Sequence, residues 1–320
     1  GAEPISTSLC KEFLEWASQY GLAANAMCPV YGLAEASLAV SISNLSNEVS
    51  SYSVERGILG VGDKVVEKPE REDGVPHVNV GKVVPYCSLR IVGNTGKPVG
   101  DHLVGHIQIK GKNVSSGYYN NREASERVLS EDGWMDTGDL GFLDRGNLYI
   151  TGRSKEIIFV NGQNYYPHGI ENIATSVEGV ELNKFIVVGN SYGHFKQEEI
   201  VGFLFWRGDL GKFLDLARKI NKQINTQLGF GLDKILPVKK IPKTTSGKLQ
   251  RFKLLDQYTR GDFEEVERSL ELHLAGESVQ KNQRNLPQSE IESELLTIWQ
   301  DLLQREDIGL EEAFFSSGGN

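Results

Sequence analysis

Short β-like runs separated by glycine, proline and asparagine turns fill much of residues 29–206, and this punctuation restricts the region to short strands. The runs with the clearest strand pattern are residues 89–92, 107–109, 148–151, 156–160, 185–188 and 200–206. No stretch of about 18 apolar residues occurs anywhere in the chain, so the sequence predicts no membrane-spanning helix.

Helical periodicity marks two segments before residue 230. Residues 8–20 predict a helix that stops at Gly21, and its expected apolar face consists of Leu9, Phe13, Ala17 and Tyr20. A stronger helix is expected between Asp209, a favourable N-cap, and Gly229, a favourable stop. The apolar stripe of this helix consists of Leu210, Phe213, Ala217, Ile220, Ile224 and Leu228.

The C-terminal part of the sequence has a different character. Residues 261–285 are polar and rich in charge, which predicts a linker with some helix in it. After Pro287, the pair Ser289 and Glu292 forms a capping box that predicts another helix. Its apolar face consists of Ile291, Leu295, Trp299 and Leu302. Because this piece is too short to bury a core alone, we interpret it as the first helix of a small helical domain.

Composition places the chain among ordinary globular proteins. The 320 residues suggest about two domains, and 39% apolar with 24% charged residues excludes collagen-like, disordered and disulfide-scaffold proteins. The cysteines Cys10, Cys28 and Cys87 form no CxxC pair, which argues against zinc and redox motifs and fits a reducing cytoplasm. The N-terminus has neither a signal peptide nor an initiator Met, so we expect a cytoplasmic protein and a chain that begins inside a larger one.

The formal net charge of −9 is unevenly distributed. Residues 1–154 carry −5, residues 155–262 carry +5 and residues 263–320 carry −9. A basic middle block beside an acidic tail favours intramolecular docking or an acidic partner, although solvated faces explain the same pattern. The basic residues do not cluster with aromatic residues, so the sequence gives little support for nucleic-acid binding.

Residues 241–251 carry the most informative motif, a loop of small residues that presents Lys248. A mobile ammonium of this kind can neutralise charge where a carboxylate meets a phosphate. The segment is not a Walker-type phosphate loop, because Pro242 and Leu249 replace the required glycine and hydroxyl residues. Taken alone, the segment is explained equally well as a basic surface loop.

Three further motifs suggest nucleotide contacts. Asp139 lies in a glycine-flanked turn, where its two oxygens can accept both hydroxyls of a ribose. Arg153 precedes a strand and suits contact with an anion. In the segment that runs from Tyr31 to Glu35, the glutamate can bind Mg²⁺ while the backbone turn approaches a nucleotide. Each motif has a purely structural explanation, and for Asp139 that explanation is a simple Asp-Gly turn.

The order and spacing of these motifs resemble the adenylate-forming superfamily. The ordered set is YGxxE at residues 31–35, the glycine pattern at 105–118, TGD at 137–139, GRxK at 152–155 and PKTTSGK at 242–248. That superfamily contains acyl-CoA synthetases, luciferases and the adenylation domains of peptide synthetases. The resemblance covers about residues 1–260.

Within the superfamily, the chain is most similar to fatty acyl-AMP ligases and the acyl-ligase loading domains of polyketide synthases. Residues 1–40, residues 162–171 and an extended segment at about 41–78 carry this similarity. In that group, an insertion at this place is associated with poor use of CoA and with delivery of the acyl group to a carrier protein. The chain has Ala34 where most of the superfamily has Thr or Ser, so one hydroxyl contact to phosphate is absent.

The resemblance implies an α/β fold with four parts. Residues 1–154 would be the C-terminal part of the large adenylating domain, and residues 155–262 a small mobile α+β domain that carries the catalytic lysine loop. Residues 263–286 would be a linker and residues 287–320 the start of a carrier domain. Lys155 would be the hinge. The tail resembles the approach to a phosphopantetheine attachment site, whose modified serine would come next after Asn320.

The resemblance also implies a reaction: a fatty or other carboxylic acid is activated with ATP and Mg²⁺ as acyl-AMP, then passed to the phosphopantetheine of a fused or downstream carrier of a synthase. Lys248 would be catalytic and Glu35 would bind Mg²⁺. The nucleotide-binding residues would be Tyr31, Gly32, Asp139 and Arg153. The superfamily's phosphate loop and much of the acyl pocket would lie upstream of Gly1, so we expect the isolated chain to be inactive.

Three alternatives remain open, namely an acyl-CoA ligase, an amino-acid adenylation domain and a non-catalytic carrier or docking module. The sequence does not define acyl chain length, acceptor or oligomeric state.

Two other patterns are given structural interpretations. The GxSxG match at 189–193 lacks the helix of a nucleophile elbow and predicts a β-turn. His102 and His106 are expected in a turn and a strand rather than as metal ligands.

Overall fold

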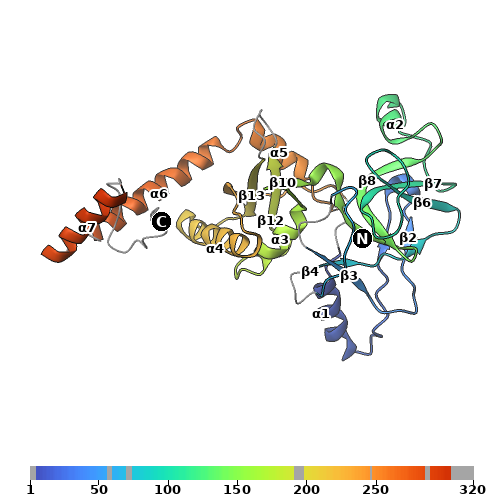
Figure 1. Cartoon of the computed structure of the whole chain (residues 1–320), viewed down its shortest axis with the longest axis horizontal. Coiled ribbons are helices and arrows are strands. Elements are labelled where there is room, and N and C mark those ends of the chain that lie inside the picture. The colour runs from blue at the N-terminus through green and yellow to red at the C-terminus, as the bar shows by residue number, and fades with distance from the viewer. Residues whose placement is uncertain are drawn as a thin grey trace.

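The computed structural model describes residues 5–55, 60–69, 74–190, 198–245, 247–284 and 289–303. These residues form a β-rich first lobe, an α/β second lobe and a helical extension toward the C-terminus (Figure 1). In Figure 1 the first lobe lies on the right, the second lobe in the middle and the extension on the left. The two lobes and the extension therefore follow one another along the long axis of the molecule in chain order.

The described residues of the first lobe form nine short strands. They are β1 (Val30–Tyr31), β2 (Ser41–Ile42), β3 (Ser51–Glu55), β4 (Gly74–Val78), β5 (Lys82–Val83), β6 (Cys87–Val92), β7 (Gly105–Gly111), β8 (Met135–Asp144) and β9 (Asn147–Arg153). The last four form an antiparallel sheet in the order β6-β7-β8-β9. A second antiparallel pair is β3-β4, and a small sheet has the order β1-β2-β5.

Helices are few among the described residues of this lobe. They are α1 (Thr7–Ser18), the 3₁₀ turn η1 (Ala34–Ala36) and α2 (Arg122–Val128). The core of the lobe lies against the four-stranded sheet, where buried residues alternate along β7 and occur in consecutive pairs or runs in β6, β8 and β9. Its central apolar side chains include Ile91, Ile107, Ile109, Met135 and Leu148.

The second lobe begins directly after β9. It contains the turn η3 (Ser154–Glu156), the hairpin β10 (Ile158–Val160) and β11 (Gln163–Tyr165), and α3 (Pro167–Thr175). These are followed by β12 (Phe185–Asn190), β13 (Glu199–Phe205), α4 (Leu210–Leu228), β14 (Lys234–Val238) and α5 (Arg251–Thr259). Strands β13 and β14 are parallel, so they require a crossover connection, which α4 supplies.

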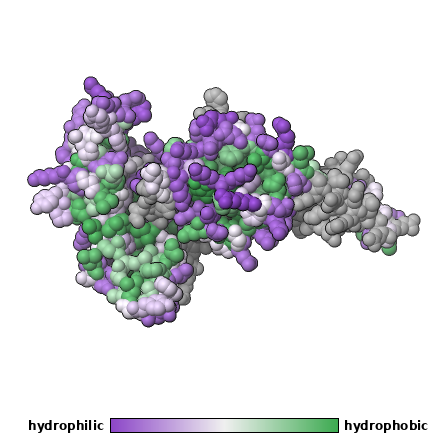
Figure 2. Space-filling view, turned by 180° about the vertical axis from the view of Figure 1, so that it is seen from behind, coloured by the Kyte–Doolittle hydropathy of each residue, from purple (hydrophilic) through white to green (hydrophobic). Residues whose placement is uncertain are grey.

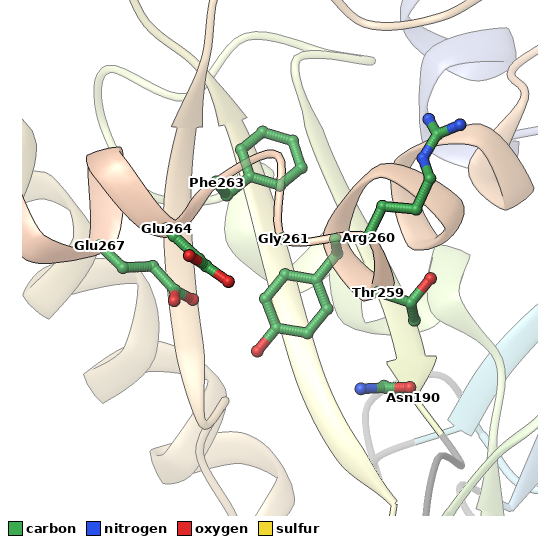
Figure 3. Close-up of a pocket in the computed structure, with 8 residues that line it drawn as sticks. Asn190, Thr259, Arg260, Gly261, Phe263, Glu264 and Glu267 are labelled. Atoms are coloured by element: carbon green, nitrogen blue, oxygen red, sulfur yellow. The ribbon is translucent and has the colours of Figure 1, made fainter.

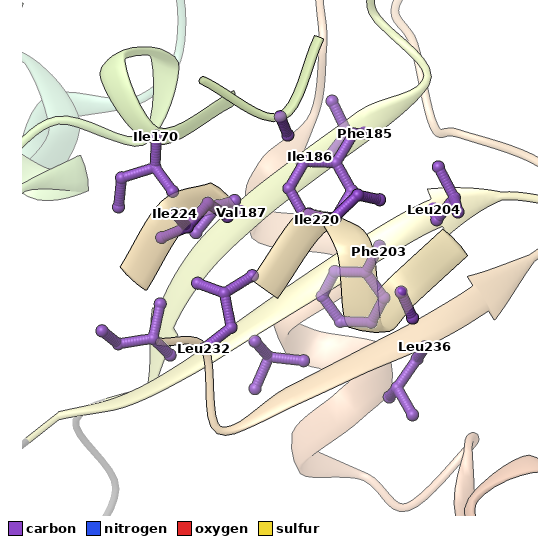
Figure 4. Packing of buried hydrophobic residues seen from close by; sticks show 14 of the residues in the cluster. Ile170, Phe185, Ile186, Val187, Phe203, Leu204, Ile220, Ile224, Leu232 and Leu236 are labelled. Atoms are coloured by element: carbon purple, nitrogen blue, oxygen red, sulfur yellow. The ribbon is translucent and has the colours of Figure 1, made fainter. Parts of the chain in front are cut away.

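Strands β12, β13 and β14 form a three-stranded sheet in that order. The core of the second lobe lies between this sheet and the helices that cover it (Figure 4). Phe203, Phe213, Ile220 and Ile224 are fully buried there. The predicted helix between Asp209 and Gly229 is confirmed. The Asp209 side chain accepts a hydrogen bond from the Lys212 backbone N–H, and Gly229 adopts the left-handed φ of 75° that ends such a helix.

A third cluster of apolar side chains joins the two lobes. Val54 and Val65 come from the β3-β4 region, Leu140 and Phe142 from β8, and Tyr166 from the second lobe. The Phe142 ring stacks on Tyr149 at a centroid distance of 5.0 Å, and Tyr52 packs edge-on against both. The segment that separates β2 from β5 in the sequence thus packs on the sheet and reaches the start of the second lobe.

Most predicted strands are found close to their expected bounds. The exception is Glu156, which was predicted as the start of a strand but belongs to the 3₁₀ turn η3, with β10 beginning two residues later at Ile158. The turn reverses the chain as it leaves β9, and only Ile158 and Val160 alternate into the core of the second lobe. His102 lies in a turn with φ of 61° and His106 lies in β7, as predicted.

The N-terminal helix differs from its prediction. It begins at Thr7, capped by the Ser6 hydroxyl, and ends at Ser18 instead of reaching Tyr20. Its buried side consists of Thr7, Cys10 and Ala17. The predicted apolar face is wrong for Leu9, Phe13 and Tyr20, because the side chains of these three residues are exposed. Figure 2 shows a broad hydrophobic face on this lobe.

The segment predicted as a linker forms one long helix, α6 (Glu264–Arg284). The segment contains no proline and is rich in Glu, Leu, Gln and Arg, which are good helix formers that need little tertiary packing. Helix α7 (Glu290–Leu303) confirms the last predicted helix, and the Ser289 hydroxyl caps the Glu292 N–H at 3.2 Å. Residues 304–320, with the predicted carrier motif, lie outside the described residues.

The structure also bears on the predictions about the cysteines and about membrane-spanning helices. Cys10, Cys28 and Cys87 are all free thiols. No helix within the described ranges combines the length and the hydropathy needed to cross a membrane.

Candidate active site

Asp139 lies on β8 at the edge of the first lobe that faces the second lobe. Gly138 before it adopts a φ of 74°, and the Thr137 hydroxyl donates to the Ile107 carbonyl at 2.9 Å while accepting from the Asp139 N–H. The register of the sheet places Asp139 directly opposite Arg153 on β9. A glycine turn and a cross-strand pair therefore fix the carboxylate.

Two side chains contact the Asp139 carboxylate. The Tyr31 hydroxyl donates to Oδ2 at 2.7 Å, and Arg153 Nε donates to Oδ1 at 3.1 Å. Burial raises the pKa of Asp139, while Tyr31, Arg153 and Lys248 each lower it. A carboxylate has about four acceptor positions, so both oxygens retain capacity for the hydroxyls of a ligand.

Lys248 belongs to a hairpin loop of the second lobe. Lys243 and Leu249 form a β-bridge, the Thr244 N–H donates to the Lys248 carbonyl at 2.8 Å, and Gly247 adopts a φ of 88°. The Lys248 side chain is exposed, yet its charge lowers the pKa of Asp139. The ammonium group of the second lobe thus acts electrostatically on the carboxylate of the first lobe.

The YGxxE motif at residues 31–35 contacts the glycine motif at 105–118. The Tyr118 hydroxyl donates to Glu35 Oε1 at 2.8 Å, and the Ser115 N–H donates to the Glu35 carbonyl at 2.7 Å. Gly32 has a packing role, because a Cβ there would lie 1.6 Å from the Leu38 carbonyl oxygen. Ala34 occupies η1 and offers no hydroxyl.

Glu35 suits only one kind of magnesium site. Within the part of the chain that the structure describes, no group of three or more His, Cys, Asp and Glu side chains is arranged to hold a metal. Mg²⁺ commonly binds one or two carboxylates and completes its octahedron with substrate phosphates and water. The donor set here is one half-buried carboxylate, which fits that mode and does not fit a resident metal held by protein alone.

The remaining residues that the sequence analysis singled out lie at the junction of the lobes, in β12 and in a turn beside the sheet. Lys155 is exposed in η3, at the junction between β9 and the second lobe. In the GxSxG match, Gly189 lies in β12, while Ser191 and Gly193 lie outside the described residues. His102 Nε2 lies 3.1 Å from Asp144 Oδ1, a pair that ties a turn to the sheet.

Sequence reasoning missed two pairs beside this site. One is Tyr118 with Glu35, which are 83 residues apart. The other is Arg251 with Glu171, a buried ion pair between residues 80 positions apart. Both glutamates lie in segments that the motifs had marked, but a single sequence carries no signal for such distant partners.

A separate pocket of about 360 Å³ lies at the corner where α5 meets α6 (Figure 3). Its lining includes Asn190, Arg260, Phe263, Glu264 and Glu267. None of the predicted site residues lines it. The candidate active site is therefore the open region between Asp139 and Lys248, and not this pocket.

Comparisons with known proteins indicate the family of the chain. Residues 1–119 match the family model described as AMP-binding enzyme. The chain is 32% identical over 274 residues to the medium-chain-fatty-acid–[acyl-carrier-protein] ligase TtuA of Teredinibacter turnerae, which covers 78% of this chain and 42% of the ligase.

Two solved structures have similar folds. The structure of McyG A-PCP complexed with phenylalanyl-adenylate has a TM-score of 0.78 and 29% identity, and the match covers 99% of this chain and 47% of that one. The fatty acyl-adenylate ligases from E. coli and L. pneumophila give a TM-score of 0.73 at 33% identity, over 82% of this chain and 46% of that one.

These findings confirm the resemblance drawn from the motifs. Residues 1–119 match the AMP-binding enzyme family, and the chain has an α/β fold similar to that of adenylation domains and fatty acyl-adenylate ligases of the adenylate-forming superfamily. It spans less than half the length of these relatives.

Proposed function

We propose that this chain is part of an acid–AMP ligase. In this proposal a carboxylic acid attacks the α-phosphorus of ATP, pyrophosphate leaves and acyl-AMP remains bound. The thiol of a carrier phosphopantetheine then loses its proton and attacks the acyl carbonyl, so that a thioester forms, the acyl–phosphate bond breaks and AMP leaves. The observation that carries the proposal is the convergence of Lys248, Arg153 and Tyr31 on the buried carboxylate of Asp139.

Each residue receives a role from its chemistry. Nucleotidyl transfer needs positioning and charge neutralisation more than covalent help from the protein. Asp139 accepts the ribose hydroxyls, and Tyr31 and Arg153 hold it ionised and correctly oriented. Lys248 stabilises the negative charge where carboxylate and α-phosphate meet. Gly32 lets the backbone run close to Leu38 beside the nucleotide.

Magnesium bound to the phosphates of ATP would neutralise their charge. Glu35 would supply its carboxylate ligand, oriented by Tyr118.

The domain assignment follows from the same proposal. We place the boundary of the large and small adenylating domains at residues 1–154 and 155–262, with Lys155 as the hinge. The exposed position of Lys155 between β9 and the second lobe supports rotation there. Residues 263–286 then connect to a carrier domain and residues 287–320 begin it. The match to McyG A-PCP over 99% of this chain supports this assignment.

A fatty acid is the substrate class that we favour. Identity is 32–33% with the medium-chain fatty-acid ligase and the fatty acyl-adenylate ligases, against 29% with McyG A-PCP. The β3-β4 hairpin lies in the segment whose extension resembles the fatty acyl-AMP ligases. Its packing between the sheet and Tyr166 supports a preference for carrier over CoA as acceptor.

A second candidate is an adenylation unit for another acid. The match that covers 99% of the chain is with McyG A-PCP, described with phenylalanyl-adenylate, and a keto acid-selecting synthetase module matches with a TM-score of 0.76 at 31% identity. An exchange assay with a panel of fatty, amino and keto acids separates the candidates. An acyl-CoA ligase would be recognised by product release with free CoA.

The test uses the longer protein that we propose contains this chain. Lys248→Ala is expected to reduce acid-dependent pyrophosphate release by about 10²–10³-fold, the usual loss for one electrostatic contact to a transition state. Lys240→Ala is the matched control, because Lys240 is equally exposed just before the same loop. Near-normal release by Lys248→Ala would contradict the proposal.

A further inference from the structure

A buried ion pair lies directly behind the Lys248 loop. Arg251 NH2 donates to Glu171 Oε2 at 2.5 Å, and the two side chains are only 12% and 11% exposed. The other oxygen of Glu171 accepts the Val187 backbone N–H at 2.8 Å. Glu171 is thus fixed to both the sheet and Arg251, and removal of either partner would leave a buried charge unpaired.

Arg251 is connected to Lys248 by a short and hydrogen-bonded stretch of chain. The Lys248 N–H donates to the Thr244 hydroxyl at 3.0 Å, and the Gln250 N–H donates to the Pro242 carbonyl at 3.0 Å, which closes the base of the loop. Arg251 follows immediately as the first residue of α5. The base of the lysine loop and the guanidinium group therefore form one rigid unit.

Helix α5 gives no energetic reason for an arginine at its first position, Arg251. A cation at a helix N-terminus opposes the helix dipole, and the side chain of Gln250 makes no capping bond at the start of α5. The ion pair with Glu171 therefore holds this end of the helix. Since α3 carries Glu171, the pair fixes the lysine loop to the body of the second lobe.

A second carboxylate extends the connection toward the first lobe. Arg251 Nε is buried without a hydrogen-bond partner among the described residues, and it lies 3.9 Å from Glu156 Oε2. Glu156 is the last residue of η3 and follows Lys155. One guanidinium group thus lies between the lysine loop, α3 and the junction of the two lobes.

We propose that Arg251 and Glu171 are positioning residues for Lys248. The inference rests on the proposed function, because it concerns the same lysine. The pair holds the base of the loop so that the Lys248 ammonium meets the acyl phosphate when the lobes are in the observed arrangement. Neither residue touches the nucleotide. Their effect on the reaction passes entirely through the position of Lys248, and a misplacement of about 1 Å typically costs up to 10²-fold in rate.

The charge state of Glu171 gives a specific readout. Burial raises its pKa to about 7, while Arg251 and the Val187 N–H lower it and Glu156 raises it. His168 on the same helix has a pKa lowered to about 3 by burial and by the nearby charges of His77 and Arg251, so it stays neutral near pH 7. The adenylation rate is therefore expected to rise through pH 7 as Glu171 ionises and its bond to Arg251 strengthens.

The experiment measures acid-dependent pyrophosphate exchange by the full-length protein. Glu171→Gln keeps the shape of the side chain but removes its charge, and it is expected to lower kcat by about 10- to 100-fold with little change in KM for ATP. The variant is also expected to lose the rise through pH 7. Arg251→Lys, which keeps the charge and loses the forked geometry, is expected to fall between wild type and Glu171→Gln. Lys253→Ala, exposed on the same helix, is the control.

A double variant separates positioning from general destabilisation. If the pair acts only through Lys248, then Lys248→Ala combined with Glu171→Gln is no slower than Lys248→Ala alone. Thermal unfolding of each variant identifies any that does not fold, and Arg251→Lys then provides the comparison. A wild-type kcat and pH profile for Glu171→Gln, or additive losses in the double variant, would overturn the inference. Full activity of Lys248→Ala would instead contradict the proposed function.

Discussion

At the scale of single residues, Asp139 is held by a partner that its motif does not contain. Tyr31 comes from a strand 108 positions away and donates to the carboxylate, and the burial of its ring raises its own pKa well above the usual range. The phenol therefore stays protonated, and remains a donor, at neutral pH. The acidity of Asp139 depends on Tyr31 as well as on Arg153 and Lys248.

We expect Tyr31→Phe to weaken nucleotide binding and leave the fold intact. The substitution removes one hydrogen bond to a charged group, for which about 1.5–3 kcal/mol is typical, so KM for ATP should rise at least about tenfold. It also removes a contact that lowers the pKa of Asp139, so the loss should be larger at low pH. Pyrophosphate exchange at varied ATP and pH measures both effects, with Tyr20→Phe, a highly exposed tyrosine, as the control.

Glu171 makes the stability of the protein depend on pH in a defined direction. Its pKa is raised from 4.5 to about 7, so the folded state binds its proton more tightly than the unfolded chain does. The contribution of this group to the free energy of unfolding therefore falls as pH rises from about 4.5 to 7 and is constant above 7. Unfolding temperatures of the full-length protein at pH 5 and pH 8 should differ less for Glu171→Gln than for wild type. An unchanged difference would contradict this assignment.

The residue-scale site was partly predictable. Asp139, Arg153 and Lys248 could be chosen because glycine turns and small-residue loops mark their positions locally, and the structure brings them together. Tyr118 with Glu35 and Arg251 with Glu171 could not be paired, because their contacts depend on tertiary packing across about 80 residues. Local sequence determines which side chains a turn presents, but it does not determine what they face.

At the scale of elements, the packing of α3 on β9 has little tolerance. A Cβ on Gly152 would lie 2.1 Å from the Tyr166 ring, whose hydroxyl lies 3.1 Å from the Thr151 hydroxyl. The tyrosine belongs to the cluster that joins the two lobes. A glycine at this position is therefore required for the close approach of the second lobe.

Gly152→Ala is expected to destabilise the full-length protein by about 1–3 kcal/mol, the usual cost of overpacking a core. Because the tyrosine must move away from the sheet, the lobes should also lose their observed arrangement and adenylation should slow. Gly169→Ala is the control, since a Cβ there meets nothing within 4 Å and lies in helix α3. Thermal unfolding and pyrophosphate exchange measure the two effects, and a stable, active Gly152→Ala would show that the ring moves without cost.

Elements were predicted best where several sequence signals agreed. The helix from Leu210 to Leu228 has a cap, a stripe and a glycine stop that all agree. The segment of α6 was taken for a linker because high charge suggested solvation, yet its residues favour helix, and Val266 and Leu270 in its first turns pack on the core of the second lobe. The N-terminal helix shows the opposite error, since its apolar periodicity was real but its apolar face is not buried.

At the scale of the whole molecule, the ordered motifs identified the superfamily, but the arrangement of the lobes could not be read from them. The motifs predict that Lys248 and Asp139 take part in one reaction, whereas the approach of the two residues depends on the packing around Tyr166 and η3. The same limit applies to surfaces. Whether an apolar stripe is core or surface depends on what else is folded beside it.

The exposed aromatic face of α1 therefore leads to a prediction about association. Phe13, Trp16 and Tyr20 form a ladder with ring centroids 6.1 and 5.3 Å apart, and their side chains are 45%, 58% and 73% exposed. Contiguous apolar surface of this kind promotes contact between molecules. Residues 1–320 expressed alone should self-associate, and Phe13→Ser with Trp16→Ser should shift the sedimentation profile toward monomer. Leu272→Ser, which removes an equally exposed leucine from α6, is the control, and equal shifts in both variants would assign association to general stickiness and not to α1.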